Sequence, residues 1–522
     1  MLSLKKAFDE LVEEYRSDYA IGTNSRFRPQ PKGVASSGSG ADYHYRHELQ
    51  FLRGIERARS YDRNNMVIRQ GVNRLVANVL PQDGFKLDPK TGDKEADKIL
   101  KEKWLEWSTD PRKCDYTWEL TYNAIARLAF RHMIVDGDCS DLPDRDTGSL
   151  RYFEAHRMRT PKGTKRNVIC GVMKDAEDRR TEYWLTRNDV SPLSAVKLVR
   201  EIKAFPAYDE DGHKLVNHHY FRDRFSQTRG VSAFAAPVDV IGMHDDIQFA
   251  ALVKSQISNC FTIFEEILEG AEQPKEDQNT GSSSTIQNSD GTERVVEGVG
   301  PGQRVQGTPG MKLHGFSPNI PNPEFFPHAL MMLTFIAINL DLPVAVLLLD
   351  PSNTNFSGWR GAMEQARMRF RVMQSELVET HHKPHYTWKV RQWLTEDKRL
   401  QSLAQKEGVN IFGHRFKAKG YGYIEPVKDA TADLIRGANT LTSLRRLSDE
   451  KGEDWDDITT ESVEDRALLI EKAIVKAIEI NKKFPKLSPK VSWRELACLA
   501  VPDSVKVMVG YEKDNNNNDS NN

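Results

Sequence analysis

The sequence predicts an α+β fold that is predominantly α-helical, and three features point that way. Apolar residues recur at helical spacing over long stretches, among them residues 48–80, 359–394 and 429–483. Short runs rich in aromatic and β-branched residues gather between residues 151 and 225. A polar, glycine-rich stretch at 272–310 separates two further helical patterns, so a helix, an excursion and a second helix follow one another.

Length and composition limit the possible functions. A chain of 522 residues suggests several domains, and 39% hydrophobic with 29% charged residues is typical of soluble globular proteins. The net charge of -1 gives no global reason to bind nucleic acid, so any DNA contact must be local or ring-shaped. The five cysteines lack metal-ligand spacing, which favours reduced thiols in a cytoplasm-like compartment. The first residues lack the apolar core of a signal peptide.

The first half of the chain predicts an arm, helices and then strands. Residues 20–45 are rich in Gly, Ser and Pro, and we expect an arm that reaches onto a neighbour or into solvent. One helical block covers 48–80 and a second covers 92–132, where three tryptophans are available as core anchors. These are Trp104, Trp107 and Trp118. Strands are predicted at 151–158, 167–173, 181–186 and 204–225.

The second half predicts mainly helices. A long helix is expected from Pro237 to about Glu269, where Gly270 would end it. The polar excursion carries two short predicted strands, at 295–299 and 303–307, and helix returns at 323–340. A turn-rich loop at 350–358 precedes the helix that begins at Trp359, and the asparagine-rich end of the chain is predicted to be disordered.

Residues 329–349 are apolar enough to raise the alternative of a membrane span. Asn339, Asp341 and Pro343 argue against it, because a carboxylate is costly in hydrocarbon and proline interrupts a helix. We therefore expect a buried helix followed by a short apolar strand or turn.

No catalytic or cofactor-binding motif stands out. The chain has no G-x-x-x-x-G-K-[ST], G-x-S-x-G or H-E-x-x-H sequence, so neither an ATP-driven motor nor a hydrolase is predicted. His381, His382 and His385 have ligand-like spacing, but Pro384 interrupts them, and we expect a solvated or interface patch at a helix kink. Three acidic residues, Asp454, Asp456 and Asp457, predict the solvated N-terminal face of a helix and not a cation site.

Two groups of residues could face a phosphate backbone. Arg360, Arg367, Arg369 and Arg371 follow one helix, where Glu364 and Glu376 offer the alternative of ordinary ion pairs. The loop at 353–355 has small polar side chains that could touch DNA without gripping it, and the alternative there is a helix N-cap.

Four segments in order along the chain resemble the lambda-type family of phage portal proteins. They are residues 57–85, 218–238, 338–370 and 423–458. The matching positions are Arg57, Arg59, Arg63, Asn64, Asn65, Asn78 and Val79 in the first segment, Arg224, Gln227, Arg229, Gly230, Val231, Ser232 and Pro237 in the second, Pro343, Asn355 and Ser357 in the third, and Pro426 and Lys428 in the fourth. The chain departs from the family pattern at Pro81, Leu342, Phe356 and Glu425.

The resemblance implies a homododecameric ring whose subunits have a wing, a two-helix stem, a clip and a crown. Its expected division is an N-terminal arm (1–47), wing (48–236), first stem helix (237–270), clip (271–322), second stem helix (323–343), tunnel loop (344–358), long helix and wing return (359–428), crown helices (429–510) and disordered tail (511–522).

The resemblance also implies a function without enzymatic activity, cofactor or metal: a channel for DNA packaging and ejection at the capsid vertex of the virion, assembled in the host cytoplasm. Expected partners are double-stranded DNA, the terminase large subunit, the major capsid protein with its scaffold, and a head–tail adaptor. The implied channel residues are Asp350, Ser352, Asn353, Thr354, Asn355 and Arg360, and the implied partner surface of the clip has Lys275, Arg294, Arg304 and Lys312. A membrane-associated pore and a nucleic-acid enzyme are the alternatives.

Overall fold

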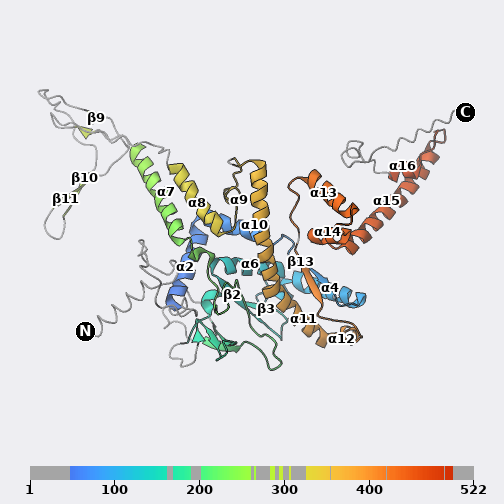
Figure 1. Ribbon diagram of the computed structural model, residues 1–522, viewed down its shortest axis with the longest axis horizontal. Coiled ribbons are helices and arrows are strands. Elements are labelled where there is room, and N and C mark those ends of the chain that lie inside the picture. Colours follow the sequence, from blue (N-terminus) through green and yellow to red (C-terminus); the bar gives the residue numbers. More distant parts are fainter. Residues whose placement is uncertain are drawn as a thin grey trace. The chain divides into compact units, whose positions relative to one another are not determined.

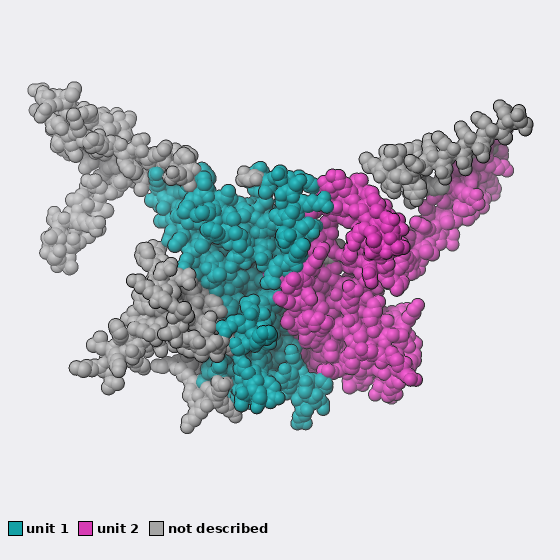
Figure 2. All heavy atoms as spheres, viewed as in Figure 1, with its two compact units in different colours: residues 1–76, 128–142, 152–370 teal, residues 77–127, 143–151, 371–522 magenta. Residues whose placement is uncertain are grey.

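The computed structural model divides the chain into two compact units, which are coloured separately in Figure 2. Unit 1 comprises residues 1–76, 128–142 and 152–370, and unit 2 comprises 77–127, 143–151 and 371–522. The residues that the structure describes are 48–161, 168–187, 189, 202–259, 264–265, 283–287, 293–297, 305–306, 325–352, 354–418, 420–486 and 488–497.

Helices dominate the described residues, as the sequence predicts (Figure 1). They are α2 (Glu48–Asn64), α3 (Met66–Val79), α4 (Lys94–Thr109), α5 (Pro111–Cys114), α6 (Tyr122–Val135), η3 (Ala155–Arg157), η5 (Ala233–Ala235), α7 (Val238–Asn259), α8 (Phe325–Asn339), α9 (Val344–Leu348), α10 (Phe356–Leu377), η6 (Val378–His382), α11 (Lys383–Glu396), α12 (Lys398–Ala404), α13 (Pro426–Ala438), α14 (Leu444–Glu450), α15 (Trp455–Lys483) and α16 (Trp493–Ala497). The predicted helical block at 48–80 is divided at Asn65, whose side-chain oxygen accepts the backbone N–H groups of Val67 and Ile68 and so caps α3.

The strands are short and form small sheets. They are β1 (Lys86–Pro89), β2 (Asp138–Pro143), β3 (Leu150–Glu154), β4 (Val168–Ile169), β5 (Val172–Lys174), β6 (Arg180–Thr186), β7 (Ile202–Pro206), β8 (Asn217–Tyr220), β9 (Phe264–Glu265), β10 (Ser283–Gln287), β11 (Glu293–Glu297), β12 (Val305–Gln306) and β13 (His414–Lys417). Their sheet orders are β3-β2-β8, β4-β5-β6-β7, β1-β13, β10-β11 and β9-β12.

The sheets of unit 1 enclose an apolar core. Phe153 of β3, Val172 of β5 and Tyr183 of β6 are buried together there, with Met158, Leu185, Ala207 and Val216. The strands predicted from residues 151–225 are thus confirmed in part. The first of them ends at Glu154, where η3 follows, and the stretch predicted at 204–225 is strand only at the end of β7 and in β8.

The core of unit 2 is aromatic. The Trp104 ring lies 5.1 Å from both Trp107 and Tyr122 between centroids, and 5.6 Å from Tyr386. Two of the predicted anchors are thus confirmed. The third, Trp118, is wrong as an anchor: its side chain is 67% exposed on a turn where its φ is 65°. Asp115 shapes that turn by accepting the backbone N–H groups of Glu119 and Leu120.

Two predicted boundaries are corrected by the structure. The helix expected to reach Glu269 ends at Asn259, and Phe264–Glu265 pairs in parallel with Val305–Gln306. Residues 261–264 are aromatic and β-branched, types that favour extended backbone over helix. The apolar run after Pro343 forms the short helix α9 and neither a strand nor a simple turn.

The expectation of a buried helix within residues 329–349 also needs correction. Met332, Ile336 and Ala337 of α8 are buried, whereas Phe326, Phe335 and Ile338 are exposed. No helix among the described residues has both the length and the apolar character needed to cross a membrane.

Candidate functional site

The turn between α8 and α9 fixes the start of the predicted channel loop, and all of this lies in unit 1. The Asn339 amide donates to the backbone carbonyl of Ala233, 2.8 Å away. Gly71 of α3 packs against the turn so closely that a Cβ there would lie 2.6 Å from Leu340 Cδ1. Pro343 stands at the N-cap of α9 in extended conformation, where its restricted φ suits the start of a helix.

The predicted channel residues form an exposed, locally bonded turn. Asp350 accepts the backbone N–H of Ser352, and hydrogen bonds with Ser352 lower the pKa of the Asp350 carboxyl. The Thr354 hydroxyl donates to the Pro351 carbonyl. Asn355 accepts the N–H of Gly358 at 2.7 Å, which confirms the N-cap alternative for this residue. Asn353 lies outside the described residues.

The arginines of α10 are partly engaged with carboxylates. Arg367 pairs with Glu364 at 3.1 Å, and Arg369 pairs with Asp341 at 3.2 Å. Arg360 is half-buried and Arg371 is exposed. Contact with DNA stays a prediction for all four.

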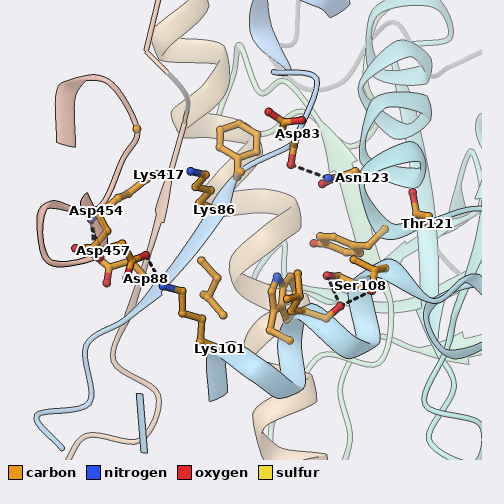
Figure 3. A pocket seen from close by; sticks show the side chains of 17 residues that line it. Asp83, Lys86, Asp88, Lys101, Ser108, Thr121, Asn123, Lys417, Asp454 and Asp457 are labelled. Atoms are coloured by element: carbon orange, nitrogen blue, oxygen red, sulfur yellow. Dashed lines mark hydrogen bonds and ion pairs between the residues drawn. The ribbon is translucent and has the colours of Figure 1, made fainter. Parts of the chain in front are cut away.

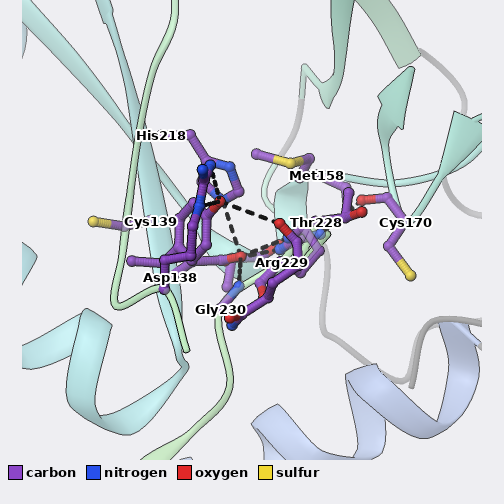
Figure 4. A network of polar contacts seen from close by, with 12 residues as sticks. Asp138, Cys139, Met158, Cys170, His218, Thr228, Arg229 and Gly230 are labelled. Atoms are coloured by element: carbon purple, nitrogen blue, oxygen red, sulfur yellow. Dashed lines mark hydrogen bonds and ion pairs between the residues drawn. The ribbon is translucent and has the colours of Figure 1, made fainter. Parts of the chain in front are cut away.

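The second family segment forms a buried polar network around Arg229, whose side chain is fully buried (Figure 4). Its Nε and Nη2 donate to the two carboxylate oxygens of Asp138, at 2.6 and 2.8 Å. The other N–H groups reach the carbonyls of Ala155, Met158 and Cys170. The guanidinium thereby joins β2 to η3 and to the turn between β4 and β5.

Asp138 is the hub of this network. It also accepts hydrogen bonds from the backbone N–H of Gly230 at 3.0 Å and from the His218 ring, whose Nε2 is 3.0 Å away. Burial alone would raise the pKa of Asp138, but the Arg229 guanidinium outweighs this and holds it well below its ordinary value. Burial lowers the pKa of His218 to about 4, so this ring is neutral at pH 7. Sequence reasoning missed Asp138 and His218, because nothing in their spacing connects them to residue 229.

Gln227 and Gly230 shape the same segment. The Gln227 amide donates to the Arg229 carbonyl and accepts the backbone N–H of Asp223. A Cβ at Gly230 would lie 1.9 Å from the carbonyl oxygen of Gly137, so the two backbones meet only because this position lacks a side chain. Gln227, Arg229 and Gly230 therefore stabilise the fold of this segment and do not form an open reactive site. Arg224, another position of the same family segment, is half-buried.

Two other family positions lie at the start of α13. Pro426 is in its first turn, with Glu425 as the N-cap residue, and Lys428 pairs with Glu425 at 3.1 Å. The predicted acidic run is confirmed as a helix start, because Asp454 caps α15 by accepting the N–H of Asp456.

The expectation of a solvated or interface patch formed by the three histidines is wrong. His381, His382 and His385 are buried in unit 2, and the Nδ1 atom of each lies 3.0–3.2 Å from the Tyr122 hydroxyl oxygen. The helix does not stop before Pro384: α10 continues through the π-helical turn η6 into α11. The three Nδ1 atoms thus share one tyrosine hydroxyl, which offers one donor and two acceptor sites.

One further group has metal-ligand chemistry. Ligand atoms of Asp209, Asp211 and His213 lie within 4.8 Å of one another. The Asp209 carboxylate, however, already accepts the backbone N–H groups of Asp211 and His213, so it organises a turn.

Most of the predicted partner surface of the clip lies outside the described residues. Lys275, Arg304 and Lys312 lie outside the described residues, and of Arg294 only the backbone is described, in β11.

Comparison with known proteins gives a family match. A family model described as "Phage portal protein, lambda family" matches residues 28–374, more than half of the chain. No curated protein matches.

Among solved structures, a chain of "Neck of empty GTA particle computed with C6 symmetry" is similar over 76% of this chain and 93% of its own, with 13% identity and a TM-score of 0.39. A chain of "Virion of native gene transfer agent (GTA) particle" is similar over 80% of this chain and 96% of its own, with 13% identity and a TM-score of 0.38. At such TM-scores these likenesses carry no argument, and the family match over residues 28–374 decides: the chain belongs to the lambda family of phage portal proteins.

Proposed function

We propose that this protein forms the ring-shaped channel at the capsid vertex through which double-stranded DNA is packaged and ejected. The observation that carries the proposal is the match of residues 28–374 to the portal family. The protein acts as a structural component and not as an enzyme, since the sequence has no nucleotide-binding motif and a separate motor must supply the energy.

The faces of α7 and α8 support a ring. The two helices pack against each other in unit 1, yet Phe249 of α7 is 70% exposed and Ile338 of α8 is 64% exposed. Leu252, three residues after Phe249 in α7, and Phe335, three residues before Ile338 in α8, are exposed as well. Large apolar side chains gathered on paired helices are typical of an interaction surface. We assign it to neighbouring copies in a heterologous ring interface, which closes without leaving an unsatisfied face.

The chemistry of the chain suits a conduit. DNA of any sequence must slide through the channel, so contacts with its phosphates must be weak and local, because each neutralised phosphate adds salt-dependent affinity. A net charge of -1 and the small polar residues at 353–355 meet this requirement. In this proposal the loop and Arg360 face the DNA.

The remaining assignments follow from the family. Residues 237–343 supply the stem and clip, the terminase large subunit docks on the clip during packaging, and a head–tail adaptor takes its place afterwards. The major capsid protein and its scaffold surround the ring, which assembles in the host cytoplasm and stays in the virion. The apolar residues 329–349 act within the protein and not in a membrane, since Asn339 and Asp341 make polar contacts there.

The test is the mass of the native assembly without detergent, measured by native mass spectrometry and followed by particle imaging. We expect a closed ring of about twelve copies with a hole wide enough for duplex DNA, since closed symmetric oligomers need no further partner. A protein that stays monomeric or dimeric at all concentrations, or that forms rings only in detergent, would reject the conduit and favour a different role.

A further inference from the structure

A cavity in unit 2 has its buried charge paired within the subunit (Figure 3). Its volume is about 430 Å³, and its lining comes from α4, β1, β13 and the start of α15. The Lys417 and Lys90 ammonium groups lie 3.0 and 3.1 Å from the two carboxylate oxygens of Asp88. A surface better suited to a partner lies in unit 1, at the loop between β8 and η5.

This loop, residues 221–226, presents a fully exposed aromatic side chain on a fixed backbone. The exposed side chain is that of Phe225. On one side of it, the Gln227 side-chain oxygen accepts the backbone N–H of Arg224 at 3.3 Å, and the Gln227 N–H donates to the Arg224 carbonyl at 3.2 Å. On the other side, the Lys174 ammonium donates to the carbonyl of the next residue at 3.1 Å. Because the loop is already held in place, little further entropy is lost when a partner buries the ring.

Basic side chains surround the base of the loop. The Arg180 and Arg222 guanidinium groups lie 5.1 and 5.7 Å from the centre of the Tyr220 ring. Partial burial lowers the pKa of Lys214, and the positive charges of Arg180 and Arg222 lower it further, so these three cations are neighbours. Arg222 has no carboxylate partner in the part of the chain that the structure describes. The loop is therefore a cationic surface with an aromatic tip.

The donors of this surface favour a protein partner over a nucleic acid. Lys174 and Arg180 donate to backbone carbonyls of the loop and of the residues that follow it, and Arg222 donates to the Tyr220 hydroxyl. These N–H groups are engaged within the subunit, so the surface supplies positive charge but few donors for phosphate oxygens. An exposed Phe225 ring suits an apolar face of another protein that also carries carboxylates.

The exposed face of α7 has this complementary character. Asp245, Phe249 and Leu252 are spaced by four and three residues, so they lie along one stripe of the helix. Their side chains are exposed, Phe249 by 70% and Leu252 by 65%. Met243 and Asp246 are exposed on the same helix. Among the described residues, no lysine or arginine pairs with Asp245. The face is thus apolar and acidic.

We propose that Phe225 of one copy packs on Phe249 and Leu252 of the next copy in the ring. Arg222 then faces Asp245 at the edge of the contact, where opposite charges favour the correct register. The inference rests on the proposed ring and names what covers the apolar face of α7. A loop of one copy on a helix of the next is a heterologous contact, which repeats around a closed ring.

A photochemical cross-link tests the contact on the full chain. Benzoylphenylalanine replaces Phe225, and copies labelled with ¹⁵N are mixed with unlabelled copies before assembly. We expect cross-links between differently labelled copies, to the peptide that contains Phe249 and Leu252. Cross-links confined to one copy, or to other segments of the neighbour, would overturn the assignment. The same probe at Trp118, an exposed aromatic residue on a turn of unit 2, is the matched control and should not react with α7.

A double-mutant cycle measures whether the two aromatic rings act together. Phe225→Ala and Phe249→Ala should leave the urea midpoint of the subunit unchanged, since both side chains are exposed. Each should raise the subunit concentration at half-assembly about tenfold or more, as expected for an interface anchor. The double variant should lie within about twofold of the weaker single variant, because both changes remove the same contact. Effects that multiply would overturn the pairing, and Trp118→Ala should change nothing.

The salt dependence of assembly tests the charged edge of the contact. Asp245→Asn removes the charge but keeps an oxygen that can accept the Asn65 amide, which is 2.8 Å from Asp245 Oδ1. Assembly of the unchanged protein should weaken as salt rises, and assembly of Asp245→Asn should weaken less steeply. Equal salt dependence of the two proteins would overturn the placement of Arg222 against Asp245.

These measurements separate the contact from the function beneath it. Rings that form equally well from Phe225→Ala would remove the contact and leave the portal role intact. Copies that cross-link from Phe225 to α7 yet never form closed rings would support the contact and reject the ring. A fluorescent oligonucleotide that binds the unchanged protein but not Phe225→Ala, while assembly is unaffected, would assign the loop to nucleic acid and overturn the proposal.

Discussion

The network around Arg229 and the paired helices α7 and α8 use their residues in opposite ways. The Arg229 guanidinium and the Asp138 carboxylate are both buried and paired, and Asp138 receives two guanidinium N–H groups, a backbone N–H and a histidine ring. On α7 and α8, large apolar side chains such as Phe249 and Ile338 remain exposed. The polar groups around Arg229 are therefore satisfied within one subunit. The apolar faces of α7 and α8, in contrast, would be covered only when subunits assemble. Changes in the first should therefore unfold the subunit, and changes in the second should spare it.

The largest effect is expected from Arg229→Met. It would leave the Asp138 carboxylate buried without its cation, and removing one partner of a buried pair costs about 3–5 kcal/mol. The urea midpoint of the subunit's unfolding transition measures the loss. Arg369→Met, which removes an exposed pair with Asp341, is the control and should cost less than about 1 kcal/mol. Equal losses in the two variants would contradict the special role of the network.

A smaller loss is expected from Gly230→Ala. The added Cβ would meet the Gly137 carbonyl at 1.9 Å, and such overpacking costs about 1–3 kcal/mol. Gly242→Ala is the matched control, because this glycine lies in α7 with open space around its Cβ position. That change should stabilise the subunit by about 0.5–1 kcal/mol. The two variants should thus shift the midpoint in opposite directions, and a shift in the same direction would argue against the close backbone approach.

The pH dependence of the subunit's unfolding free energy should reflect the protonation of His218. Its folded-state pKa of about 4 is below the ordinary value of 6.5, so the unfolded chain takes up the proton first as the pH falls. The stability due to the neutral ring is fully present above pH 6.5 and is lost progressively towards pH 4. At pH 5 the loss should be about 1–2 kcal/mol. Unfolding curves of His218→Gln should decline less steeply over this range; an unchanged slope would assign the decline to other groups.

The smallest effect on subunit stability, within about 0.5 kcal/mol, is expected from Ile338→Glu, since the side chain is exposed. Its effect on assembly should be large, because the charge would enter the proposed subunit interface. Native mass spectrometry should show subunits in place of rings. Met66→Glu, at another exposed apolar residue outside α7 and α8, is the comparison. Rings that persist with Ile338→Glu would exclude this face from the interface.

Much of the fold was predictable where local pattern decides the structure. The helical period at 48–80 and 359–394 predicted α2, α3, α10 and α11, and the aromatic and β-branched runs predicted β3 to β6. The errors arose where contacts with neighbouring residues outweigh the local sequence pattern. Trp118 looked like a core residue but stands on a turn organised by Asp115. The histidines beside Pro384 looked like a patch at a helix kink, although the π-helical turn η6 continues the helix and the three side chains are buried.

The candidate site was predictable in part. The family segments drew attention to Arg229 and Gly230, and the N-cap role of Asn355 was among the alternatives raised from its residue type. The partners of Arg229 are about 60 to 90 residues away along the chain, so no local spacing reveals them. The cavity beside Asp88 was not foreseen either, because it is made by elements from both ends of unit 2.

By itself the sequence determined the helix-rich α+β character, the order of helix, polar excursion and helix, and the resemblance to the portal family. These rest on periodicity, composition and residue identity, which are properties of short segments. The sequence did not reveal which charges are buried together, that three histidines converge on Tyr122, or which apolar faces stay uncovered. Those features depend on contacts between distant segments, and the free energy of a buried charge is set by the groups that surround it in space.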